Sequence, residues 1–134
     1  MIATVPLLII PLAIYNIFSF ITPGLNWTDV LLTVPMVSGV DWALTLSDVF
    51  IAFSLLLLFL EIVKATSAST RSIVDHMLST LVFVGALIEF LLVGRAATST
   101  FALLLAIMLV DIIAGYSVSI RVARRDVAID PRME

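Results

Sequence analysis

Residues 100–120 read TFALLLAIMLVDIIAGYSVSI, and Asp111 is the only charged side chain in this run. A helix rises 1.5 Å per residue, so about 20 apolar residues cross the roughly 30 Å hydrocarbon core of a bilayer. The run is therefore predicted to be a transmembrane helix. Three further stretches have the same character, at residues 2–21, 45–63 and 72–93. The sequence thus predicts an all-α integral membrane protein, folded as a bundle of four transmembrane helices.

The composition supports this fold class. Hydrophobic residues make up 62% of the 134-residue chain, charged residues make up 13%, and the mean hydropathy is +1.23. A soluble domain is about half apolar and about a quarter charged, so a water-soluble globule is excluded. Four spans of about 20 residues leave no room for a second domain. The net charge of −3, with basic residues confined to helix ends, provides no surface for nucleic acid.

The first apolar stretch resembles a secretory signal only superficially. It lacks a basic segment in front of it, and a small-residue cleavage site does not follow it. We expect it to be retained as the first helix. Pro6 and Pro11 lie inside it, and a kink is the ordinary consequence of proline in a membrane helix.

The longest connection covers residues 23–47 and carries both tryptophans of the chain, Trp27 and Trp42. Tryptophan prefers the level of the lipid headgroups, so both residues are predicted to anchor this loop at one membrane surface. The middle of the loop, residues 30–37, is apolar but too short to cross. It is expected to lie on the interface or to fold back against the bundle.

Two helix starts have capping signals. Ser47 is predicted to cap the second span, which places Asp48 in its first turn, where the helix dipole favours a carboxylate. Ser72 and Asp75 have the spacing of a capping box at the start of the third span.

The orientation follows from the basic residues. Cytoplasmic segments of membrane proteins are enriched in lysine and arginine. Arg95 alone lies on the side of the long loop, whereas the linker between the second and third spans and the tail at residues 121–134 hold all the others: Lys64, Arg71, Arg121, Arg124, Arg125 and Arg132. Both termini are therefore predicted to be cytoplasmic, in a plasma membrane such as a bacterial inner membrane. Lys64, Arg121, Arg124 and Arg125 are expected to anchor the helix ends at its surface.

Besides Asp48 and Asp75 near helix starts, three acidic residues lie well within the predicted spans: Glu61, Glu89 and Asp111. A charge near mid-bilayer costs about 2.5 to 3.5 kcal/mol on insertion scales, so such residues are functional candidates. Glu61 precedes Lys64 by one helical turn, and an ion pair with this lysine explains it. Asp111 lies at the centre of its span, so its charged form is expected to have the highest free energy of membrane insertion of the three.

Small residues accompany the other two acids on the same helix faces. Gly85 and Ala86 precede Glu89 by four and three residues, and Ala114 and Gly115 follow Asp111 at the same spacings. Small residues allow membrane helices to approach closely. Both acids are therefore expected to point into the bundle, toward each other or toward the first two spans.

Two interpretations of Glu89 and Asp111 remain open at this point. As neutral carboxyl groups they can form a polar clasp that holds helices together, worth about 0.6 to 2 kcal/mol. Burial favours the neutral form of a carboxyl group, so they can also relay protons near neutral pH. The amide of the same shape distinguishes these roles, because it keeps the hydrogen bonds and loses the proton.

No cofactor or metal is predicted. His76 is the only histidine and the chain has no cysteine, so neither a bis-histidine haem nor a zinc site can be completed within it. The first functional hypothesis is a noncatalytic structural or accessory subunit, assembled with copies of itself or with a larger membrane complex. The alternative is a proton-coupled transporter or channel that uses the intramembrane carboxylates. A holin-like protein is a third possibility.

Overall fold

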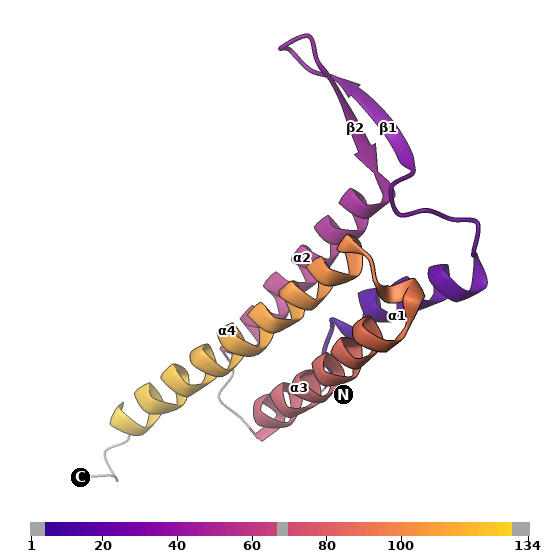
Figure 1. Ribbon diagram of the computed structural model, residues 1–134. Helices are drawn as coiled ribbons and strands as arrows, with labels where there is room; N and C mark the ends of the chain where they lie inside the picture. Colours follow the sequence, from indigo (N-terminus) through magenta and orange to yellow (C-terminus); the bar gives the residue numbers. More distant parts are fainter. Residues whose placement is uncertain (1–4, 67–69, 130–134) are drawn as a thin grey trace.

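The computed structural model describes residues 5–66 and 70–129 (Figure 1). Within them the chain forms four α-helices and one β-hairpin. The elements are α1 (Ile9–Ile21), β1 (Val30–Pro35), β2 (Asp41–Thr45), α2 (Leu46–Lys64), α3 (Thr70–Leu92), the short 3₁₀ helix η2 (Gly94–Ala96) and α4 (Ser99–Ile129). Helix α4 packs against α2 on one side and α3 on the other, and α1 contacts α2 and α4.

Three helices are long and apolar enough to cross a membrane, over Leu46–Lys64, Ile73–Leu92 and Ser99–Val118. The short η2 turn makes α3 and α4 antiparallel neighbours, as the sequence predicts. The first predicted span, residues 2–21, is shorter than expected. Helix α1 has 13 residues, or about 20 Å at 1.5 Å per residue, which is less than the thickness of a hydrocarbon core.

Proline explains the late start of α1. Pro11 is the third residue of the helix, where the proline ring is tolerated because the N–H groups of the first turn have no partner within a helix. At this position Pro11 removes no hydrogen bond from the interior of α1, and Pro6 lies before the helix, so neither proline requires a kink. The chain from residue 5 to residue 8 runs into the bundle without helical structure.

Helix α4 extends beyond the predicted boundary at residue 120 and ends at Ile129. The apolar part of α4 that is long enough to cross a membrane is Ser99–Val118, close to the predicted span, and the helix continues beyond it. Basic residues end membrane insertion, but alanine and arginine favour helix. No glycine or proline occurs between Gly115 and Ile129 to interrupt it.

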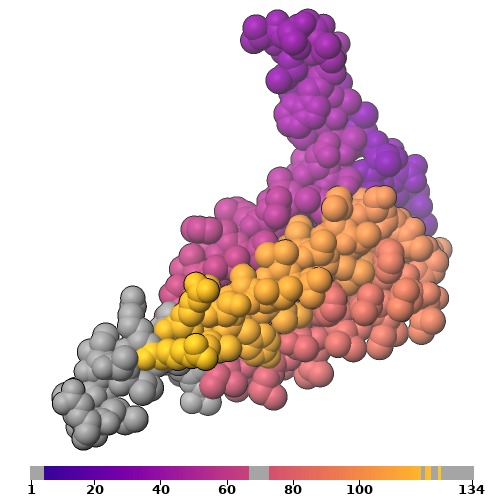
Figure 2. Space-filling model, turned by 60° about the vertical axis from the view of Figure 1, so that its left-hand side comes forward, coloured from indigo at the N-terminus to yellow at the C-terminus, as the bar shows by residue number. Residues whose placement is uncertain are grey.

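The long connection is not a loop that folds back on the bundle, and its hairpin corrects the all-α prediction. Strands β1 and β2 pair antiparallel and place Leu32 opposite Leu44 and Val34 opposite Trp42. Gly39, with φ of 91°, supplies the left-handed residue of the turn. The hairpin projects from the helical body as a narrow extension (Figure 2). The sequence does not predict these strands, because VLLTVP is an almost continuous apolar run without period-two alternation.

The predicted helix caps are also corrected. Thr45 caps α2: its hydroxyl accepts the Asp48 N–H at 3.2 Å, and the Asp48 carboxylate accepts the Thr45 N–H at 2.9 Å. Asp48 lies in the first turn as predicted. The Ser47 hydroxyl is instead 2.7 Å from Thr100 Oγ1 on α4. Asp75 is outside the first turn of α3, which begins at Thr70.

Candidate functional site

A buried polar cluster lies at the end of the bundle opposite the hairpin. We call it the polar cluster, and its members come from α2, α3 and α4: Glu61, Lys64, Asp75, His76, Ser79 and Asp111. Lys64 is at its centre, with Nζ 2.9 Å from Glu61 Oε1 and 3.5 Å from Asp75 Oδ1. The ion pair predicted from the Glu61 spacing is thus present. Lys64 faces inward more than an interface anchor would, with 21% of its side chain exposed.

The polar cluster also holds the segment that precedes α1. Glu61 Oε1 accepts the Leu7 N–H at 2.8 Å, and Lys64 Nζ donates to the Val5 carbonyl at 2.9 Å. These backbone groups lie before the first helical turn and lack helical partners. Glu61 and Lys64 therefore tie the start of the described chain to α2 and, through Asp75, to α3.

Asp111 enters the polar cluster from α4 and is 2% exposed. It lines a narrow crevice together with Ser79 of α3 and with Pro6 and Leu8 of the N-terminal segment. The crevice is too tight to admit a water molecule. Asp111 Oδ1, Ser79 Oγ and Glu61 Oε2 make no hydrogen bond within the described residues. Such buried oxygens are costly.

Gly115 allows α3 and α4 to approach closely beside the polar cluster. A Cβ atom at this position would lie 2.8 Å from His76 Cε1 and 3.0 Å from His76 Nδ1, so even alanine would force the imidazole to move. The ring of His76 also lies 5.1 Å from that of Tyr116. His76 of α3 is therefore a buried packing residue of this helix contact, and Ala114 lies half-buried on α4 next to Gly115.

Glu89 and Asp111 do not meet. Glu89 is half-buried, and its Oε1 accepts a hydrogen bond from Asn16 Nδ2 of α1 at 3.3 Å. Of its two small neighbours, Ala86 is buried, whereas Gly85 is exposed and no atom lies within 4 Å of where its Cβ would be. The close contact expected at Gly85 does not occur among the described residues. Glu89 thus points toward the first helix, one of the two directions that the sequence allowed.

The hairpin end of the bundle is organised by a group of rings that we call the aromatic cluster: Tyr15, Trp27, Phe50 and Phe101. Tyr15 is fully buried. It stacks on Trp27 at 4.8 Å, and its hydroxyl donates to the Arg95 carbonyl at 2.9 Å and lies 2.7 Å from Thr98 Oγ1. Trp27 is therefore a packed, half-buried residue, whereas Trp42 remains 49% exposed on the hairpin.

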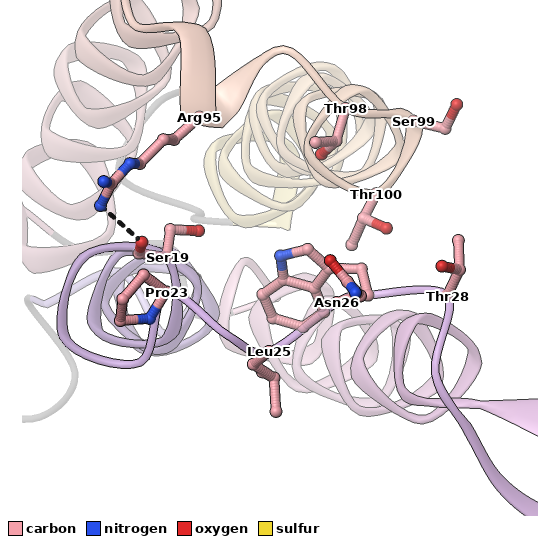
Figure 3. A pocket seen from close by; sticks show the side chains of 10 residues that line it. Ser19, Pro23, Leu25, Asn26, Thr28, Arg95, Thr98, Ser99 and Thr100 are labelled. Carbon is pink, nitrogen blue, oxygen red and sulfur yellow. Dashed lines mark hydrogen bonds between the residues drawn. The ribbon is translucent and has the colours of Figure 1, made fainter.

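A pocket of about 420 Å³, which we call the hairpin-end pocket, opens beside the aromatic cluster. Arg95 and Ser19 lie on one side of it and Thr98, Ser99 and Thr100 on the other (Figure 3). The segment after α1 completes the lining with Pro23, Leu25, Asn26, Trp27 and Thr28. The sequence predicts only that Arg95 lies on the same side of the membrane as the long loop. It does not predict the pocket, because nothing in the linear pattern brings α1 and α4 together there.

Two of the basic residues predicted as anchors on α4 have described side chains. Arg121 and Arg124 are exposed on the extended α4. The Arg125 side chain, Arg71 and Arg132 lie outside the described side chains. Among the described residues, no group of three or more histidine, cysteine, aspartate or glutamate side chains is placed to hold a metal ion. Comparison of the chain with protein-family models, curated proteins and solved structures finds no match.

Proposed function

We propose that this chain is a noncatalytic structural or accessory subunit of a membrane assembly, embedded in the lipid bilayer of a plasma membrane. The observation that carries the proposal is the polar cluster, whose ion pairs and hydrogen bonds join α2, α3 and the N-terminal segment. Asp111 of α4 lines the adjoining crevice, which is too tight for water. These ion pairs and hydrogen bonds stabilise the packing of the helices. The outward faces of α2, α3 and α4 are apolar and exposed, which suits contact with lipid or with other membrane helices.

A second candidate, a proton-coupled transporter or channel, is favoured by one specific observation. The unpaired oxygens of Asp111, Ser79 and Glu61 lie in the same cluster, next to a lysine. Buried ionisable groups in a membrane often mark proton pathways. In this reading a second conformation opens the crevice to water, and Asp111 gains and loses a proton.

Copurification distinguishes the two. An affinity-tagged chain, extracted in mild detergent and weighed by native mass spectrometry, is expected to leave the membrane in a complex of fixed stoichiometry, heavier than the 14.6 kDa monomer. In proteoliposomes it is expected to conduct no protons. Asp111→Asn and Glu89→Gln keep hydrogen-bonding capacity, so the complex should survive both. A monomer with proton flux that Asp111→Asn abolishes would contradict the subunit proposal and support the second candidate.

We infer also that both termini are cytoplasmic, with the hairpin on the opposite side. The support is the excess of lysine and arginine at the helix ends remote from the hairpin. Green fluorescent protein, which matures in the bacterial cytoplasm but not after export through the general secretory pathway, should fluoresce when fused after Glu134. It should stay dark when inserted between β1 and β2. The reverse pattern would invert the topology.

A further inference from the structure

The hairpin-end pocket is large enough to hold part of a small molecule. Its volume of about 420 Å³ falls in the range of about 300 to 1,000 Å³ that is usual for ligand sites. It is lined by hydroxyl, amide and guanidinium groups around the indole of Trp27. None of its lining residues is acidic, so a negatively charged group would meet no like charge on the pocket wall.

Arg95 supplies the charge. Its Nη1 donates to the Ser19 carbonyl at 3.0 Å, and its guanidinium carbon lies 5.4 Å from the centre of the Phe20 ring. These two contacts fix the plane of the guanidinium and leave its other N–H groups for a ligand. No carboxylate pairs with Arg95 in the part of the chain that the structure describes. A fixed guanidinium with spare donors is suited to a carboxylate or phosphate.

The opposite wall offers uncharged donors. Thr98 caps α4 by accepting the Phe101 N–H at 3.1 Å. The backbone N–H groups of Ser99 and Thr100, the Ser99 hydroxyl and the side-chain amide of Asn26 make no hydrogen bond within residues 5–66 and 70–129, whereas the Asn26 backbone N–H donates to Asp29 Oδ2 at 3.2 Å. Donors of a first helical turn favour anions, and a phosphate binds several such donors at once. Arg95 and the start of α4 thus face the same pocket from two sides (Figure 3).

The surroundings favour a lipid as the source of the phosphate. Ser19 and Arg95 adjoin large apolar side chains on the outer surface, which are the exposed Ile17, Phe20 and Ile21 of α1 and Leu91 and Leu92 of α3. Acyl chains can lie along these residues while a headgroup occupies the polar pocket. Trp27 in the lining suits the headgroup level as well.

We propose that the hairpin-end pocket binds the phosphate group of a phospholipid headgroup, through Arg95 and the first turn of α4. A soluble phosphate ester has the same chemistry at its charged end. The experiment therefore has to separate a lipid from a soluble source.

Binding can be measured on purified protein in a nonionic detergent by native mass spectrometry and by the emission of Trp27, after Trp42→Phe removes the other tryptophan. The probes are dioleoyl phosphatidylglycerol, dioleoylglycerol, which lacks the phosphate, and glycerol 3-phosphate. We expect phosphatidylglycerol to bind at least tenfold more tightly than dioleoylglycerol. Glycerol 3-phosphate binding as tightly as the lipid would assign the phosphate site to a soluble ester, and the lipid source would be wrong.

Two variants test the pocket itself. Arg95→Gln is expected to weaken phosphatidylglycerol binding about tenfold or more, because a charge-assisted contact is lost. Ser99→Asp places a carboxylate at the start of α4. The helix dipole favours this negative charge, whereas a bound phosphate is repelled by it. This variant should retain the helical circular dichroism while losing binding. Arg121→Gln, an exposed arginine remote from the pocket, is the matched control and should bind normally. Equal binding of dioleoylglycerol, or unchanged binding in a folded Ser99→Asp variant, would overturn the proposal.

Discussion

Lys64→Met is expected to lower the free energy of unfolding by about 3 to 5 kcal/mol, because removing one partner of a buried ion pair leaves an uncompensated charge. Lys64 is the cation within hydrogen-bonding distance of both Glu61 and Asp75, whose side chains are almost fully buried. The variant would also release the Val5 carbonyl. Denaturant titration in detergent micelles, followed by circular dichroism, measures the loss.

Three further variants test whether the loss of stability comes from the charge of Lys64 and its ion pairs. Lys64→Arg keeps a cation and should lose less. Arg124→Met removes an exposed charge from α4 and should change stability by less than about 0.5 kcal/mol. Combining Lys64→Met with Glu61→Gln and Asp75→Asn removes the stranded charges and should recover part of the loss. A Lys64→Met protein as stable as the Arg124→Met control would show that the polar cluster does not hold the helices together.

Tyr15→Ala should cost about 3 to 5 kcal/mol of stability, the usual range for removing a large aromatic side chain from a core. Tyr15 is fully buried at the junction of α1, α2 and α4, where its ring contacts Trp27, Phe50 and Phe101. The same titration measures the loss. The emission of Trp27 should also move to longer wavelength, because its stacking partner is gone.

The controls for Tyr15 separate its ring from its hydroxyl. Tyr15→Phe keeps the ring and leaves the Arg95 carbonyl without this donor and the Thr98 hydroxyl without this acceptor, at a cost of about 1 to 3 kcal/mol. Phe59→Ala removes an aromatic residue that is exposed on α2, and should have little effect. If Tyr15→Ala and Phe59→Ala were equally stable, the aromatic cluster would not be a core.

The polar cluster positions the start of α1, and the aromatic cluster positions its C-terminal half. With 13 residues, this helix alone is shorter than a membrane span. It contacts α2 and α4 less extensively than α4 contacts α2 and α3. At its start, Glu61 and Lys64 hold the backbone of Leu7 and Val5. At its end, Tyr15 is enclosed by rings and bonded to the turn before α4. Specific polar contacts therefore replace the packing area that a longer helix would provide.

Sequence reasoning determined what depends on local composition and period. Apolar length located α2, α3 and α4 to within a few residues, apart from the C-terminal extension of α4, because a span requires a stretch of apolar residues in one piece. The spacing of Glu61 and Lys64 determined their ion pair, because residues three apart are neighbours on a helix. The hairpin has only a weak local signal, because its strands do not alternate polar and apolar residues and mainly the β-branched Val30, Thr33 and Val34 and the turn glycine Gly39 favour it.

Only the tertiary structure decided which polar residues share a site. Asp75 and Ser79 lie one helical turn apart on α3, whereas Asp111 lies on α4, and helix rotation and depth bring them to one end of the bundle with Glu61 and Lys64 of α2. The same rotation turns Glu89 toward Asn16 and leaves Gly85 on the surface. Arg95 and the start of α4 likewise meet the end of α1 only after folding. Periodicity assigns a residue to a face of its own helix, but the partner of that face is chosen by packing among all the helices.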